Sequence, residues 1–137
     1  EAMAKMLEGV NISFLSLINS IGNGLVVDSE TETVVIKPKG GFGGLGGTLI
    51  KPVALANVRA FWKLFQGRMP LIGVGGVVTG TDVFEHLLCG ASAVQVGTTL
   101  VDEGLSSFER LEKELADILN KKGYSSVEAC RGKLKEL

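Results

Sequence analysis

Two short segments, about 20 residues apart, carry residue types that can bind a phosphate group. Gly73-Val74-Gly75-Gly76 and Val96-Gly97-Thr98 each end a short apolar run, and each precedes a predicted helix. Backbone N–H groups at glycine can approach an anion closely, helix N-termini add positive potential, and a threonine hydroxyl adds a donor. Glycines that only make tight strand-to-helix turns are the alternative, but paired loops favour one phosphate cup. Its residues would be Gly75, Gly76, Gly97 and Thr98.

Two further segments suit a flat ring and a polar substrate. Gly46-Gly47 follows an apolar stretch and could let the backbone approach a ring, although composition alone fits a flexible surface loop equally well. Asn19 offers a donor pair and an acceptor together, which suits an imide or pyrimidine edge, and Ser20 can donate or accept. By itself, an Asn-Ser pair is more typical of a turn. If these segments lie together in the fold, ligand binding is favoured over a surface loop and a simple turn.

No side chain can be named from the sequence as a general base, acid or nucleophile. His86 is the only histidine, so it cannot share a metal site with another, and we predict a structural or surface role. Lys51 is also interpreted as structural. Cys89 and Cys130 have neither metal-ligand spacing nor the density of a disulfide framework, which favours reduced thiols in a reducing compartment. A solvated helix face is predicted for Glu109, Glu112, Glu114 and Asp117.

Short apolar runs and helical periodicity alternate along the chain. The predicted strands are 12–18, 71–74 and 93–96, the first of them buried on both faces. The predicted helices are 1–9, 52–67, 79–88, 106–123, the last opened by a Ser106/Glu109 capping box, and a short tail around 127–130. Between the first strand and the second helix, 25–27 and 34–36 predict a hairpin excursion, and 40–47 a glycine-rich loop.

This order predicts an α/β fold with a parallel sheet and crossover helices. We expect about three to four βα units, the C-terminal portion of a TIM (β/α)8 barrel, with a β-hairpin excursion after the first strand. Residues 1–137 would then be the C-terminal part of one domain. A complete barrel takes about 250 residues, so we expect a missing N-terminal half, on the same parent chain or as a retained fragment.

Composition excludes two classes of partner. The net charge is −1 and the 14 basic residues are scattered, so we expect neither nucleic acid nor an anionic membrane as a partner. No apolar run approaches the roughly 20 residues needed to span a bilayer, and the first residues lack the order of a signal peptide. We therefore expect a cytoplasmic protein.

Five segments together carry a family resemblance, and the Asn-Ser-Ile-Gly-Asn-Gly stretch is the most specific of them. They are Ile18-Asn19-Ser20-Ile21-Gly22-Asn23-Gly24, Lys39-Gly40-Gly41-Phe42-Gly43-Gly44-Leu45-Gly46-Gly47, Ile50-Lys51-Pro52-Val53-Ala54-Leu55-Ala56-Asn57-Val58, Gly75-Gly76-Val77-Val78-Thr79-Gly80 and Glu85-His86-Leu87-Leu88-Cys89-Gly90-Ala91. Over nearly all of its length the sequence resembles the class 1A, fumarate-using dihydroorotate dehydrogenases.

This resemblance implies an FMN-dependent oxidoreductase that oxidises dihydroorotate to orotate in pyrimidine biosynthesis, passes the electrons to fumarate, and forms a homodimer. The family's catalytic cysteine base and active-site lysines belong to the earlier half of the barrel, so no catalytic residue is assigned here. Residues 1–137 alone should show no turnover and weak flavin binding. The implied roles are orotate binding for Asn19 and Ser20, the isoalloxazine border for Ile18, the flavin side for Gly46 and Gly47, and the FMN phosphate for Gly75, Gly76, Gly97 and Thr98.

Two other functions stay open on the sequence. One is a phosphate-binding TIM-barrel enzyme without flavin, such as an isomerase or synthase. The other is a non-catalytic half-barrel that acts as an assembly module. Neither explains the Asn19-Ser20 pair and the glycine loops together.

Overall fold

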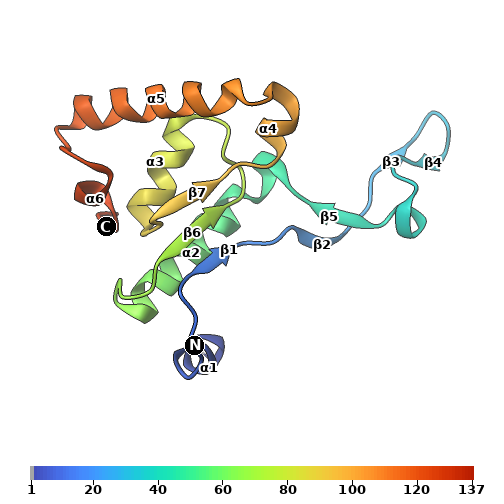
Figure 1. Cartoon of the computed structure of the whole chain (residues 1–137). Helices are drawn as coiled ribbons and strands as arrows, with labels where there is room; N and C mark the ends of the chain where they lie inside the picture. The colour runs from blue at the N-terminus through green and yellow to red at the C-terminus, as the bar shows by residue number, and fades with distance from the viewer. Residues whose placement is uncertain (1) are drawn as a thin grey trace.

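The computed structural model describes residues 2–137, and its centre is a three-stranded parallel sheet (Figure 1). The strands are β1 (Leu15–Leu17), β6 (Leu71–Val74) and β7 (Ala93–Gln95), in the order β1-β6-β7. Leu15 pairs with Leu71, and Gly73 pairs with Val94. All three strands therefore end at the same edge of the sheet, and the segments that follow them are neighbours.

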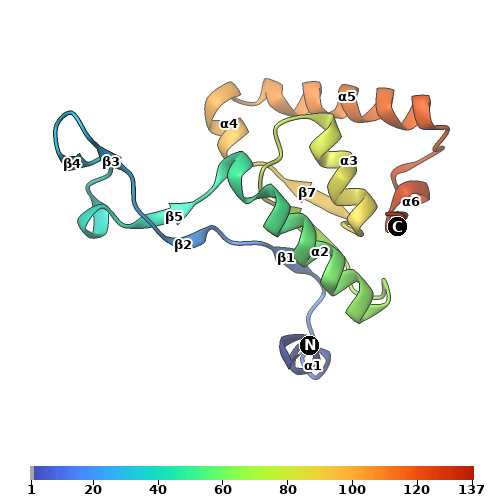
Figure 2. The same cartoon turned by 180° about the vertical axis from the view of Figure 1, so that it is seen from behind.

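Two long helices connect the strands and cover the sheet. Helix α2 (Lys51–Phe65) packs against β1 and β6, while α3 (Gly80–Cys89) packs against β7 and α2. Helix α5 (Ser106–Lys122) crosses the outside of α3, and α6 (Val127–Cys130) follows it (Figure 2). Among the described residues, each helix is too short or too polar to cross a bilayer.

The core lies in two apolar clusters on either side of α3. One contains Phe84, Leu87 and Leu111, between α3 and α5. The other contains Val58 and Leu71, between α2 and β6. Burying a side chain of this size contributes about 1.5–3 kcal/mol, so these clusters hold the ends of β6 and β7 in place.

The capping box predicted at the start of the helix 106–123 is wrong. Ser106 does not open a capping box; its hydroxyl donates to the carbonyl of Glu103 at 3.0 Å. A helix that the sequence did not predict, α4 (Thr98–Glu103), runs almost directly into α5, so Ser106 bonds backward to it. The capping box is at α3, where Thr79 and Asp82 exchange hydrogen bonds. Helix α1 (Ala2–Glu8) agrees with the prediction over the described residues.

The strand after α1 is shorter and more exposed than predicted. Strand β1 covers only three residues, and Ser16 on it is exposed. Phe14, just before it, keeps 54% of its surface exposed. The predicted burial of this strand on both faces is wrong, because Leu15 and Leu17 are only half-buried and Ser16 is exposed.

Residues 21–46, here called the β arm, project away from the sheet (Figure 1). Strand β2 (Ile21–Gly24) pairs antiparallel with β5 (Gly43–Leu45), and β3 (Val27–Asp28) pairs antiparallel with β4 (Thr33–Val34). The glycine-rich segment is therefore not a structureless loop. It contains a 3-10 turn, Pro38–Gly41, and strand β5. Glycine at position 24 allows β2 to approach β5 closely, because a side chain there would meet Leu45 at 2.8 Å.

Candidate functional site

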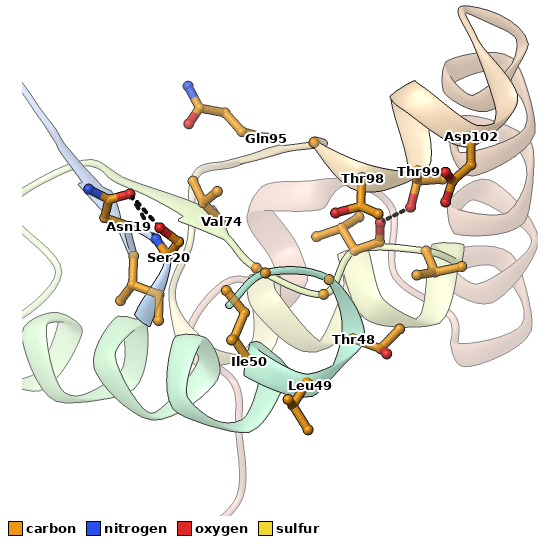
Figure 3. Close-up of a pocket in the computed structure, with 18 of the residues that line it drawn as sticks. Asn19, Ser20, Thr48, Leu49, Ile50, Val74, Gln95, Thr98, Thr99 and Asp102 are labelled. Atoms are coloured by element: carbon orange, nitrogen blue, oxygen red, sulfur yellow. Dashed lines mark hydrogen bonds between the residues drawn. The ribbon is translucent and has the colours of Figure 1, made fainter. Parts of the chain in front are cut away.

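A cavity of about 610 Å³ lies at the edge where the three parallel strands end (Figure 3). Its size falls in the range of roughly 300–1,000 Å³ that is usual for small-molecule sites. Every residue that the sequence singled out for binding lines this one cavity: Ile18, Asn19, Ser20, Gly46, Gly47, Gly75, Gly76, Gly97 and Thr98.

Each wall of the cavity comes from a different segment. Residues 18–20 follow β1, residues 75–78 follow β6, and Gly97 to Glu103 follow β7. The fourth wall is the root of the β arm and the short 3-10 helix η2 (Gly47–Ile50). A side chain at Gly47 would lie 3.8 Å from the Thr98 hydroxyl, so this wall approaches the β7 loop closely.

The loop after β6 has the backbone conformation that only glycine adopts easily. Gly75 has φ of 131° and Gly76 has φ of 70°. A Cβ at Gly75 would lie 2.9 Å from Ala54, and one at Gly76 would overlap Lys51. Both glycines are therefore required by the turn and by the close approach of α2.

In the loop after β6, carbonyl groups are bonded to other parts of the protein, whereas two N–H groups are bonded to none of the described residues. The buried Thr99 hydroxyl donates to the carbonyl of Val77 at 2.7 Å, as Figure 3 shows, and Arg110 donates to the carbonyl of Val78 at 2.9 Å. Within residues 2–137, the N–H groups of Gly76 and Val77 donate to no acceptor. Free N–H groups beside carbonyls that are already bonded favour an anion over a cation.

The first turn of α3 is not available to a ligand as the sequence suggested. The N–H of Gly80 donates to Glu114 at 2.6 Å, and the N–H of Asp82 donates to the Thr79 hydroxyl. Glu114 therefore does not lie on a purely solvated face. The hydrogen bond from Gly80 and the contact with Arg110 lower the pKa of Glu114, which keeps it charged.

Asp82 holds the loop after β6 in place through hydrogen bonds. Its carboxylate accepts hydrogen bonds from the N–H groups of Val78 and Thr79, and from Lys51 at 2.6 Å. Burial raises its pKa, but the Lys51 and backbone hydrogen bonds outweigh burial, so the pKa of Asp82 lies below its usual value. Lys51 also contacts Glu85 at 2.9 Å, which agrees with a structural role for this lysine.

His86 is fully buried behind the β6 loop and does not line the cavity. Its Nε2 lies 3.1 Å from the carbonyl oxygen of Gly75. Burial lowers the pKa of the imidazole, although the contact with Gly75 opposes this shift. Of the two roles left open by the sequence, the surface role is excluded.

At the opposite wall, Asn19 is oriented by its neighbour. Its Oδ1 accepts a hydrogen bond from the N–H of Ser20 at 2.8 Å, and the Ser20 hydroxyl lies 3.4 Å from the same oxygen. The Asn19 amide NH₂ donates to no atom of residues 2–137, so both of its donors remain for a ligand. The pair is more than a turn, because it lines the cavity.

Sequence reasoning missed several residues of the site. Thr99 was not separated from Thr98, although it is the threonine that holds the loop. Glu103 also lines the cavity, and its carboxylate forms an ion pair with Arg110 at 2.8 Å. Glu103 ends α4 and Arg110 lies seven residues later in α5, so no single helix pattern predicts the pair. The only signal in the sequence was the second hydroxyl of the Thr98-Thr99 pair. In the described part of the chain, no cluster of three His, Cys, Asp or Glu side chains could hold a metal ion.

Comparisons with known proteins identify a family for this chain. The sequence model described as dihydroorotate dehydrogenase matches residues 1–119. A protein of Enterococcus faecalis named probable dihydroorotate dehydrogenase A (fumarate) is 59% identical over all 137 residues, which are 44% of that protein. Proteins of Lachancea kluyveri and Saccharomyces cerevisiae named dihydroorotate dehydrogenase (fumarate) are 56% and 54% identical over the same span, also 44% of each.

A solved structure shows the same likeness in three dimensions. The ligand-free dihydroorotate dehydrogenase of Eimeria tenella superposes with a TM-score of 0.77 at 27% identity, over 96% of this chain and 34% of that one. The chain thus spans less than half the length of the relatives it matches. Because the family model covers most of the sequence, the chain belongs to the dihydroorotate dehydrogenase family.

Proposed function

We propose that these residues form the FMN-phosphate and part of the orotate site of a dihydroorotate dehydrogenase that uses fumarate. The observation that carries the proposal is the convergence of all nine candidate residues on one cavity. Family membership and relatives named for fumarate support the activity and its acceptor.

The cavity fits a flavin nucleotide. The loops after β6 and β7 would hold the phosphate through the free N–H groups of Gly76 and Val77 and the Thr98 hydroxyl. Side chains at Gly46 and Gly97 would meet no atom of the described chain within 4 Å, so the backbone there is open to a ligand. When bound, FMN supplies the hydride acceptor for the oxidation.

The chain's own contribution to substrate binding is at Asn19 and Ser20. The Asn19 NH₂ group and the Ser20 hydroxyl suit the carbonyl and imide groups of a pyrimidine ring. Ile18 precedes them in the same wall and would border the flavin ring with its apolar side chain. These residues bind and orient; the proton acceptor is supplied by the other part of the barrel.

The remaining strands of a TIM barrel would complete the site. Strand β1 is an edge of the sheet and its neighbourhood exposes Phe14, which a further strand and its layer of side chains would cover. We therefore expect residues 1–137 expressed alone to bind FMN weakly and to show no turnover. The homodimer and the cytoplasmic location stay predictions, which sedimentation and fractionation of the full-length protein measure.

A flavin spectrum and a single turnover test the proposed function. The full-length protein that carries this sequence should purify with the yellow flavin bands, and anaerobic dihydroorotate should bleach them. Adding fumarate should then restore the bands. A protein without flavin bands would support the isomerase or synthase alternative. Flavin that dihydroorotate does not reduce would contradict the proposed substrate.

A further inference from the structure

The peptide between Gly75 and Gly76 has a fixed orientation that a side chain on the far side determines. This peptide bond is trans, so the carbonyl of Gly75 and the N–H of Gly76 point in opposite directions. The carbonyl contacts Nε2 of His86, which is 0% exposed and lies outside the cavity lining. The N–H of Gly76 must therefore point to the other side, where the cavity is.

The tautomer of His86 follows from its two ring nitrogens. Nδ1 is buried and has no hydrogen-bond partner, whereas Nε2 faces a carbonyl oxygen. A proton on Nδ1 would be a buried donor without an acceptor, and Nε2 would then oppose the Gly75 oxygen lone pair to lone pair. The proton therefore belongs on Nε2. The charged groups around the ring are Asp82 and Glu85 on α3 and Lys51 on α2, and burial outweighs their combined effect.

The sequence makes room for this ring at Gly73. A Cβ at Gly73 would overlap the imidazole of His86, although the backbone of Gly73 itself needs no positive φ. The first glycine of Gly73-Val74-Gly75-Gly76 thus serves the histidine, while the last two serve the turn. Gly73 in β6 and the Gly75 carbonyl just after this strand therefore both lie against one buried imidazole.

We propose that His86 is a positioning residue of the site: its Nε2–H holds the Gly75 carbonyl and thereby aims the Gly76 N–H at the phosphate of the bound nucleotide. The inference rests on the proposed flavin site and adds a residue that contacts neither flavin nor substrate. It distinguishes His86 from a histidine that only fills the core, because only the positioning role depends on the ligand's phosphate.

The test compares FMN with riboflavin, which lacks the phosphate, in the full-length protein after flavin removal. His86→Leu removes the donor, and His86→Gln places an amide N–H close to the position of Nε2. Fluorescence quenching should show that His86→Leu weakens FMN binding by roughly 10-fold or more with little change for riboflavin, and that His86→Gln restores most of the loss. Equal losses for both flavins, or no loss, would overturn the positioning role.

Two controls keep this inference separate from the proposed function. If the wild-type protein binds FMN and riboflavin equally, the phosphate cup itself is wrong, whatever the variants do. If His86→Leu does not fold, nitrogen-15 NMR of the imidazole in the wild-type protein decides. An Nε2–H neutral tautomer at pH 7 supports the inference, and an Nδ1–H tautomer or an imidazolium overturns it.

Discussion

The two sides of the cavity are built on very different supports. The loops after β6 and β7 stand on a packed body, where both apolar clusters and the Asp82 and Arg110 networks fix them. The β arm that leads to Gly46 consists of two short antiparallel pairs and exposes apolar residues such as Val26 and Val35, at 58% and 59%. The proposed phosphate end of the site is therefore preorganised by these residues, while the arm side of the cavity depends on whatever covers it.

The largest effect is expected from a change that distorts the loop after β6. Gly76→Ala adds a Cβ against Lys51 at a φ of 70°, so we expect about a 100-fold loss of FMN affinity from backbone strain of a few kcal/mol. Flavin titration measures the affinity. Gly22→Ala is the matched control in the arm, since its Cβ would meet no atom within 4 Å. A tolerated Gly76→Ala would show that the loop is not constrained as described.

A second change separates the substrate wall from the phosphate wall. Asn19→Ala removes the free NH₂ donors at the end of β1, and we expect KM for dihydroorotate to rise about 10- to 100-fold. FMN affinity should stay unchanged, because the phosphate loops are not touched. Asn11→Ala, an exposed asparagine outside the cavity, is the control. Should FMN binding fall as much as substrate binding, the two walls do not act separately.

Two aspartates with similar local bonding compare the body with the arm. Asp82 and Asp28 each accept backbone N–H groups and a threonine hydroxyl, but Asp82 is buried against Lys51, whereas Asp28 is half-buried in the β arm. Asp82→Asn should lower the free energy of unfolding by about 1–3 kcal/mol, because it disrupts the capping box and leaves Lys51 paired with Glu85 alone. Asp28→Asn should leave the global unfolding midpoint unchanged. Similar losses in denaturant titrations would remove the distinction between the two regions.

The smallest expected effect is a pH dependence of the free energy of unfolding, which arises from His86 in the packed part of the protein. Burial keeps the folded pKa of His86 below about 6.5, so the unfolded chain takes up a proton that the folded chain does not as pH falls. The part of the free energy of unfolding that depends on a neutral His86 is fully present above pH 6.5. Below that pH it declines by at most about 1.4 kcal/mol per pH unit. Asp82 and Glu85 oppose the shift, and Lys51 adds to it. Urea unfolding at pH 7 and 5.5 should show a smaller decline in His86→Gln than in the wild type; equal declines would contradict the assignment.

The sequence predicted the parallel strands and the loops that line the cavity, for a local reason. Short apolar runs that end in glycine indicate both the strand and the loop at its carboxyl end, so β6 and β7 and their loops were found directly. Helix α3 was also predicted, over 79–88, and the structure places it at Gly80–Cys89. Parallel pairing then brings these ends together without further information.

What the sequence did not reveal depends on contacts between distant residues. Helix α4 was missed because its six residues contain two threonines and no apolar period. Strand β5 was missed because glycine disfavours strands, and only the partner strand β2 stabilises it. The link from Arg110 to the carbonyl of Val78 spans 32 residues and leaves no local pattern. The role of His86 likewise required knowing that Gly75 lies beside it.

A crystal structure of the FMN-loaded full-length protein would show directly whether the loops after β6 and β7 bind one dianion of a flavin nucleotide. We expect the phosphate oxygens within about 3.2 Å of the Gly76 N–H and of the Thr98 hydroxyl. The isoalloxazine ring should lie toward Ile18. A phosphate bound elsewhere, with Gly76 and Thr98 facing only water, would contradict the account.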